Sequence, residues 1–521
     1  MNADWLERLI AALVGSRHPR DRREYIVRAP AGRVLGTTSA GISSFKGIPY
    51  AAPPVGRLRW RPPQPIRPWR RVRDARTFGA KCVQPRYLGT SDSAVVGRED
   101  CLTLNVWTPA LPHPPLPVLL FLHGGAHVGG SSSDALDKEP VYDGQYLAEH
   151  GPAVLVTANY RLGSLGFIGH PALSRESGYG GSGNYGHMDQ IAALEWIRDN
   201  IEAFGGDPTR VTLFGHSAGG HSVAVLLASP LAAGLFSRAL IQSGSPRTYP
   251  LEFVEEIGER MAVALGCSGE SEVLKRLRAR PAADLLSAVP TTFEAGRGVI
   301  FGPNVDGFVL RAPILDTFRS GQHNHMPVLL GTTSDEHSTF IELMHPRLPR
   351  TSGSYRRMLA EMFGARTTRR VVRHYRPSRY ASPTDALTAV LNDLVFTCPT
   401  RQMARALSET QSEPVWRYFY TYAASEGPYE RFRAGHGLDV RLLFRGSSDR
   451  SDPPAAEQSL SDAMIHYWTR FAAIGDPNGA NDPPWPRYEM RRDRCLELGR
   501  EVRPRAGVRT AECDFWDQLG A

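Results

Sequence analysis

The amino-acid sequence predicts an α/β protein with a large, mostly parallel central sheet that is covered by helices and carries helical insertions. Near-continuous apolar runs of strand length alternate with helix-like segments through the first half of the 521-residue chain. Each apolar run ends in glycine or small polar residues. No internal repeat or low-complexity linker divides the chain. We therefore expect one domain over residues 24–521, preceded by an N-terminal extension, residues 1–23.

The predicted core strands follow one another along the chain with helices between them. Five apolar runs are of this kind: "PVLLFLHGG" from Pro117, "PAVLVTANY" from Pro152, "RVTLFGHS" from Arg210, "RALIQSGSP" from Arg238 and "MPVLLGTTSDEHSTF" from Met326. Between the second and third, "MDQIAALEWIRDNIEAFGGDP" from Met188 has apolar residues at helical spacing and stops at two glycines. This β-α-β order is typical of a parallel sheet covered on both faces.

Composition argues against nucleic-acid and membrane partners. The formal net charge is +8, but only four of the 61 basic residues are lysines, and the arginines are scattered along the chain without a nucleic-acid motif. Apolar residues make up 41% and charged residues 22%, as in ordinary globular proteins. There is no uninterrupted apolar run of about 18 residues that could span a bilayer. The oligomeric state is left open.

The N-terminal extension is a poor secretory signal. Its apolar stretch, residues 9–14, is short, acidic residues precede it, and no clean small-residue cleavage site follows. We expect a short amphipathic helix or a frayed extension there, and a cytoplasmic protein. The six cysteines are too few for a disulfide scaffold, and in a reducing cytosol they would be thiols.

The segment "FGHSAGGH", residues 214–221, places a serine in a tight turn between a predicted strand and a predicted helix. Such a turn needs glycines at Gly215 and Gly219, because side chains there would collide with neighbouring backbone. The turn exposes the Oγ of Ser217 at the head of the helix. The pattern therefore predicts a nucleophile elbow.

A nucleophilic serine also needs a base, an orienting acid and donors for the oxyanion. "LHGGAH" from Leu122 ends the first core strand in a loop whose N–H groups could face the serine. The backbone N–H groups of Gly125, Ala126 and Ala218 are the candidate oxyanion donors.

Many further segments resemble the type-B carboxylesterase and cholinesterase family of the α/β-hydrolase fold, and in particular bacterial para-nitrobenzyl-esterase-like carboxylesterases. The likeness runs from about Tyr25 to Trp516. The segments stand in the family's order: "FKGIPYAAPPVGRLRWRPPQP" from Phe45, "EDCLTLNVWTP" from Glu99, "ANYRLGSLGF" from Ala158, "GNYGHMDQ" from Gly183, "FGGDP" from Phe204, "QSGSP" from Gln242 and "GDPNG" from Gly475.

The resemblance implies the partners of Ser217. The family's acid corresponds to Glu336 in "SDEH", rather than to Asp335, and its histidine corresponds to His436 in "GHGLD". Ser243, in "QSGSP", would then support the acid. The implied chain order, serine, acid, histidine, is the order expected of this fold.

The resemblance also implies an activity: a serine carboxylic-ester hydrolase that needs no cofactor and acts on small to medium neutral esters through an acyl-enzyme. Two alternatives remain open. The same triad could transfer the acyl group to an alcohol or amine, or form a lactone, if the site excludes water. A non-catalytic binding protein of the same fold should lack a triad residue, and this chain has all three.

Four histidines depart from the family pattern. His127, His187, His216 and His337 stand where the family usually has phenylalanine, leucine, glutamate and glycine. They are either neutral space-fillers around the pocket, or they alter its charge and hydrogen bonding. Many relatives carry carboxylates at the positions of His216 and Asp439, so a His-Asp pair here would be near neutral or hold a proton at mildly acid pH.

Such a pocket should not favour choline-like cations. The segment between Cys82 and Cys101 agrees, because it has no tryptophan for a cation–π contact. No recognisable metal-ligand spacing links the histidines, so we expect no metal. Of the family's disulfides, the resemblance implies Cys82 with Cys101 and Cys398 with Cys513, whereas Cys267 lacks its family partner.

Overall fold

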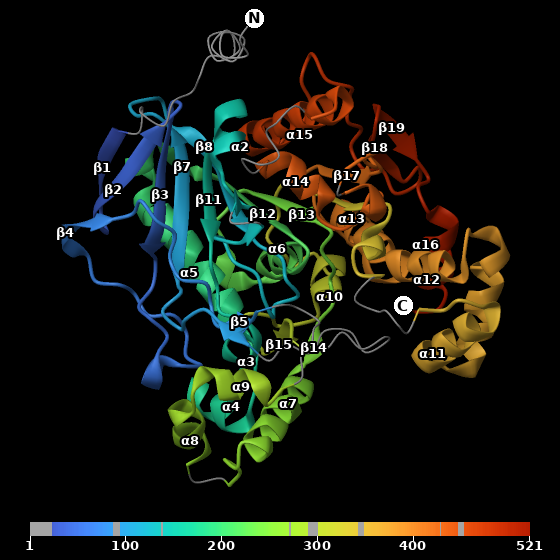
Figure 1. Ribbon diagram of the computed structural model, residues 1–521, viewed down its shortest axis with the longest axis horizontal. Helices are drawn as coiled ribbons and strands as arrows, with labels where there is room; N and C mark the ends of the chain where they lie inside the picture. The colour runs from blue at the N-terminus through green and yellow to red at the C-terminus, as the bar shows by residue number, and fades with distance from the viewer. Residues whose placement is uncertain are drawn as a thin grey trace, which may run out of the picture.

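The computed structural model describes residues 23–86, 94–136, 139–269, 272–289, 301–341, 348–427, 429–445 and 453–520. Nearly all of the N-terminal extension, with the helix expected there, lies outside these residues. In the described residues a sheet of 13 strands runs through the molecule (Figure 1). Its order is β1 (Arg23–Ala29), β2 (Gly32–Ser39), β3 (Ile42–Pro49), β7 (Thr103–Pro109), β11 (Val154–Ala158), β8 (Leu116–Leu122), β12 (Gly206–His216), β13 (Arg238–Gln242), β16 (Val328–Thr333), β17 (Val415–Tyr420), β18 (Arg494–Leu498) and β19 (Val502–Ala506), with β4 (Trp69–Asp74) paired to β2.

The centre of the sheet is parallel and its margins are mostly antiparallel. Every pairing from β11 to β18 is parallel. The pairings β1 with β2, β2 with β3, β3 with β7, β7 with β11 and β18 with β19 are antiparallel. The five predicted core strands are β8, β11, β12, β13 and β16, so the predicted mostly parallel sheet is confirmed. Short pairs lie outside it: β5 (Gln84–Pro85) with β6 (Val95–Val96), β9 (Ala135–Leu136) with β10 (Glu139–Pro140), and β14 (Tyr249–Pro250) with β15 (Asn304–Val305).

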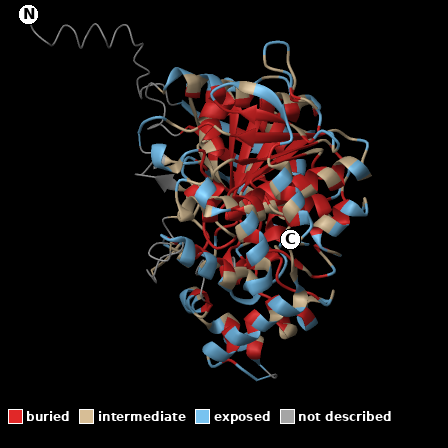
Figure 2. Cartoon of the chain, turned by 90° about the vertical axis from the view of Figure 1, so that its right-hand side faces the viewer, coloured by how far each residue is buried: buried red, intermediate tan, exposed pale blue. Residues whose placement is uncertain are grey.

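Helices cover both faces of the sheet. Successive residues of a strand point to opposite sides, so each core strand contributes side chains to two buried layers. In β8, Leu120 packs with one buried cluster and Phe121 with another. The first cluster includes residues of α5 (Tyr185–Asn200), α6 (Ala218–Ala228), α10 (Ile314–Arg319) and α13 (Cys398–Thr410). The second includes residues of α2 (Gln145–His150), α14 (Leu438–Phe444) and α15 (Ala455–Ile474). Figure 2 shows the strands buried between these layers. The predicted helix after Met188 is confirmed as α5.

The remaining helices form two groups of insertions beside the sheet (Figure 1). One group, at the bottom of the view, contains α3 (Gly163–Gly166), α4 (Pro171–Ser177), α7 (Leu251–Ala264), α8 (Val273–Ala279) and α9 (Ala282–Ser287). The other, at the lower right, contains α11 (Ser352–His374), α12 (Pro383–Asn392) and α16 (Thr510–Asp517), which share a separate buried cluster. None of the helices in the described ranges is both long and apolar enough to cross a membrane.

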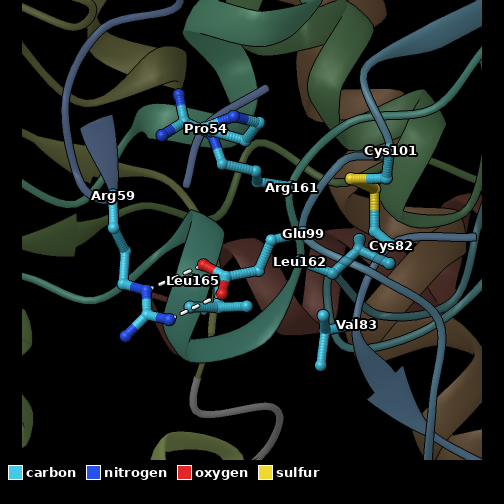
Figure 3. A pocket seen from close by; sticks show the side chains of 9 residues that line it. All are labelled: Pro54, Arg59, Cys82, Val83, Glu99, Cys101, Arg161, Leu162 and Leu165. Carbon is cyan, nitrogen blue, oxygen red and sulfur yellow. Dashed lines mark hydrogen bonds and ion pairs between the residues drawn. A yellow bond between two sulfur atoms is a disulfide. The ribbon is translucent and has the colours of Figure 1, made fainter. Parts of the chain in front are cut away.

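A partly buried ion pair ties the first insertion group to the segment before β7. Arg59 donates two hydrogen bonds to the carboxylate of Glu99, at 2.7 and 2.6 Å (Figure 3). Its third nitrogen donates to backbone carbonyls at the end of α8, including that of Arg280 at 2.7 Å. The disulfide of Cys82 and Cys101 lies beside this pair (Figure 3). The second disulfide, Cys398 with Cys513, joins α13 to α16.

Candidate active site

Ser217 occupies a strained turn between β12 and α6. β12 ends at His216, α6 begins at Ala218, and the serine between them has φ 58° and ψ −122°. Non-glycine residues rarely adopt such angles, which cost on the order of 1–3 kcal/mol. The turn is held by the N–H of Ser217, which donates to the carbonyl of Gln242 at 2.9 Å, and by its carbonyl, which accepts from His221 at 2.8 Å. Ser217 is partly exposed although its neighbours are buried.

The two glycines of the motif are required by close packing of backbone. A Cβ at Gly219 would lie 1.9 Å from the carbonyl oxygen of Leu122, the last residue of β8. A Cβ at Gly215 would lie 2.5 Å from the carbonyl carbon of Gly219. Strand β8 and helix α6 therefore approach so closely that only a hydrogen atom fits at Gly219. This agrees with the expected collision of side chains with backbone at these two positions.

Glu336 lies in a short turn after β16 and is fully buried. One carboxylate oxygen accepts a hydrogen bond from Ser243 Oγ at 2.6 Å and one from the N–H of Thr333 at 2.8 Å. The other oxygen contacts Nδ1 of His436. Burial raises the pKa of Glu336 above its usual value, and the donors from Ser243 and Thr333 oppose this shift. Ser243 thus lies where the resemblance implied.

The ring of His436 is enclosed by three other rings. Its centroid lies 4.3 Å from that of His216, 4.9 Å from Phe340 and 5.0 Å from Phe396. This burial lowers the pKa of His436, although the charge of Asp439 opposes the effect. With Nδ1 against Glu336, the buried Nε2 has no hydrogen-bond partner within the described structure, Ser217 Oγ included. Serine–histidine bonds of this kind are often loose without substrate, and the ring's contact with His216 places it beside the serine's own segment.

The topology explains why residues so far apart in sequence meet. Ser217 follows β12, Ser243 follows β13, Glu336 follows β16 and His436 follows β17. These four strands are neighbours in that order and run parallel. The carboxyl ends of parallel strands lie at one edge of a sheet, where ligands bind in open α/β folds. The structure therefore gathers these four residues at one edge.

The loop after β8 lies against the serine from the other side. A Cβ at Gly124 would be 3.0 Å from that of Ser217. Gly125 has φ 107° and Ala126 has φ 58°, so the loop turns its backbone sharply. The N–H groups of Gly125 and Ala126 donate to no acceptor among the described residues, and that of Ala218 is in the first turn of α6, where N–H groups have no intrahelical partner. Among the described residues, none of the three predicted oxyanion donors therefore has an assigned acceptor.

Two buried histidines, His127 and His187, and the partly exposed His221 pack together beside this loop. The ring centroid of His127 lies 5.5 Å from those of both His187 and His221. Nε2 of His127 is 3.3 Å from Ser222 Oγ. Burial lowers the pKa of His187 to about 3 and that of His221 to about 4, and it lowers that of His127 strongly. These rings are therefore neutral near pH 7. Among the described residues, no group of three or more His, Cys, Asp or Glu side chains is arranged to hold a metal ion.

His337, the residue after Glu336, is partly buried. Its ring lies 5.5 Å from that of Phe396, and burial lowers its pKa to about 3. Its backbone N–H donates to Asn392 Oδ1 at 2.7 Å, which ties the Glu336 turn to the end of α12.

The structure favours the neutral alternative for His216 over the one in which it holds a proton beside Asp439. No hydrogen bond joins these two described residues: Asp439 Oδ2 accepts from Gln242 at 3.0 Å and from Tyr418 at 2.7 Å. The charge of Asp439 raises the pKa of His216, but burial and the nearby His436 lower it further, to about 3. His216 therefore holds no proton at mildly acid pH, because desolvation outweighs the attraction of the carboxylate.

Several residues that contact the site were not predicted from the sequence. Phe396 and Tyr418 contact the site without any motif that marks them. Thr333 and Phe340 lie in the quoted segment from Met326 but were not singled out there. Gln242 could have been found, because it begins the quoted segment "QSGSP" and its carbonyl accepts from the elbow serine.

Comparisons with known proteins identify the family of the chain. A family model described as the carboxylesterase family matches residues 23–516. The chain is 36% identical over 514 residues to fumonisin B1 esterase of Sphingopyxis macrogoltabida, covering 96% of this chain and 91% of that protein. It is 35% identical over 491 residues to para-nitrobenzyl esterase of Bacillus subtilis (strain 168), covering 92% and 95%.

Solved structures extend the likeness to three dimensions. A PNB esterase and a thermophilic PNB esterase each match with a TM-score of 0.81 and 33% identity, over 95% of this chain and 100% of theirs. Family, relatives and structures agree with the resemblance drawn from the sequence. The chain belongs to the carboxylesterase family and is a carboxylesterase with the α/β-hydrolase fold.

Proposed function

We propose that the enzyme hydrolyses small to medium neutral carboxylic esters through an acyl-enzyme on Ser217. The observation that carries the proposal is the contact between the Glu336 carboxylate and Nδ1 of His436. Nε2 of the same ring has no hydrogen-bond partner among the described residues, and the ring lies beside the segment of the strained Ser217. The acid is buried and held by two further donors, so the ring is fixed in one orientation.

Acylation follows from this arrangement. Nε2 of His436 takes the proton of Ser217 Oγ while the oxygen attacks the ester carbonyl. The N–H groups of Gly125, Ala126 and Ala218 stabilise the developing oxyanion, and Glu336 stabilises the imidazolium. The histidine then protonates the leaving alcohol, and the ester C–O bond breaks. A water molecule repeats the steps on the acyl-enzyme and releases the acid.

The preference for neutral esters rests on the charges around the triad. His216 stands where the family usually has a glutamate, and burial keeps it neutral. The three histidines behind the oxyanion loop are neutral as well. The two named relatives are esterases of fumonisin B1 and para-nitrobenzyl esters, which supports an ester substrate here.

The test is release of p-nitrophenol from acetate, butyrate and octanoate esters by the wild type and by Ser217→Ala, with fluorophosphonate labelling in parallel. We expect the variant to lose several orders of magnitude in kcat/KM and all labelling. Unchanged activity in Ser217→Ala would refute the assignment. A competing alcohol added to the same assay separates hydrolysis from acyl transfer, because transfer yields a new ester.

A further inference from the structure

The two loops that carry Glu336 and His436 are joined by one arginine. Arg433, three residues before the histidine, pairs through Nε with Oδ1 of Asp335 at 3.1 Å. Asp335 directly precedes Glu336. The same guanidinium pairs through a terminal nitrogen with Oδ1 of Asp385 at 3.3 Å. One side chain therefore links the acid turn, the histidine loop and the first turn of α12.

The backbone around this link is closely fitted. The N–H of Asp335 donates to the carbonyl of Ala434 at 3.1 Å. Ser338 Oγ is within hydrogen-bond distance of the carbonyl oxygens of Asp335, at 2.6 Å, and Phe432. A Cβ at Gly435 would lie 2.6 Å from Thr339 Oγ1. The loops are thus in contact on both sides of Arg433, and a shift of one would move the other.

Beyond Arg433 the structure is open. A cavity of about 240 Å³ is lined by Arg433, Asp335, Asp385, Asn392 and eight other residues. The guanidinium spans one side of this space, and 47% of its side-chain surface is exposed. The two ion pairs with Asp335 and Asp385 therefore largely determine where the guanidinium lies. Arg433 itself has φ 52° and ψ −132°, so its backbone is held in an unfavourable conformation to aim the side chain.

We propose that Arg433 is a positioning residue, which sets the separation of Glu336 and His436 by clamping their loops to each other and to α12. The inference rests on the proposed roles of these two residues. Exposed ion pairs contribute little to global stability. Displacement of a catalytic group by about 1 Å, however, can lower the rate by about 100-fold. The effect of Arg433 is therefore expected in kcat and not in substrate binding.

The test compares Arg433→Ala and Arg433→Lys with the wild type on p-nitrophenyl butyrate. We expect Arg433→Ala to lose about tenfold in kcat at unchanged KM, as for a small displacement of the triad, with little change in Tm. Arg433→Lys should keep more of the rate. Millimolar guanidinium ion should restore activity to Arg433→Ala, because the adjoining cavity admits it, whereas urea of the same shape and no charge should not.

The matched control is Arg198→Ala, which removes an exposed arginine paired only with the adjacent Asp199 in the described structure, at 2.7 Å on α5. The proposal is overturned if Arg433→Ala has no larger effect than this control. It is also overturned if activity and Tm fall together without rescue by lysine or guanidinium. If Arg433→Ala does not fold, Arg433→Gln is measured against the same expectations. Fluorophosphonate labelling of the wild type at Ser217 is read separately, so failure of the triad assignment is distinguishable.

Discussion

His187 should make the enzyme less stable in mild acid, and the size of the effect follows from its burial. The ring is fully buried, its Nε2 has no partner in the described structure, and its pKa is lowered to about 3. In the unfolded chain the pKa returns to about 6.5. The unfolded state therefore binds more protons between these values, so stability falls as pH is lowered through that window. Between pH 7.5 and pH 5 the loss is about 2 kcal/mol.

The perturbation is His187→Leu, which removes the titrating group and leaves an apolar side chain among buried rings. At pH 5 the unfolded histidine is almost fully protonated and the folded one almost fully neutral, so unfolding should take up about one proton fewer in the variant. The assay is proton uptake on urea unfolding at pH 5 in weakly buffered solution, which does not require refolding. The control is His325→Leu, at an exposed position. Equal uptake by His187→Leu and the wild type would refute the reasoning.

Three further predictions concern the triad and its elbow. Burial lowers the pKa of His436, and kcat/KM needs the neutral ring, so the acid limb of kcat/KM on a neutral ester should lie below the ordinary value of about 6.5; a limb above it would contradict the assignment. Ser243→Ala leaves the buried Glu336 one donor short, which costs about 1–3 kcal/mol and should lower kcat/KM by roughly 5- to 150-fold at unchanged substrate range; steady-state kinetics with matched Tm values decide this. Gly219→Ala places a Cβ 1.9 Å from a carbonyl oxygen and should abolish fluorophosphonate labelling, whereas Gly353→Ala, with 3.7 Å to the nearest atom, should not.

Local pattern was enough to predict the strand and the elbow around Ser217, because their spacing is dictated by a single turn. Glu336 and His436 could not be found in this way, since the strands that carry them are brought beside β12 only by the sheet order. Their assignment depended on the resemblance to a family. The sequence left open whether His216 is neutral or holds a proton, because desolvation depends on the rings and backbone packed around it, such as His436, which sequence does not show.

The order of strands behind the site has a consequence for how activity appears during folding. The predicted oxyanion loop, Ser217, Glu336 and His436 follow β8, β12, β16 and β17, so the proposed active centre is complete only when pairings between distant parts of the chain have formed. Non-local parallel pairing is slow. A chain emerging from the ribosome should therefore not hydrolyse ester substrates until the segment after β17 has been synthesised and has packed against the sheet. The onset of hydrolysis during synthesis or refolding would then time the closing of this half of the sheet.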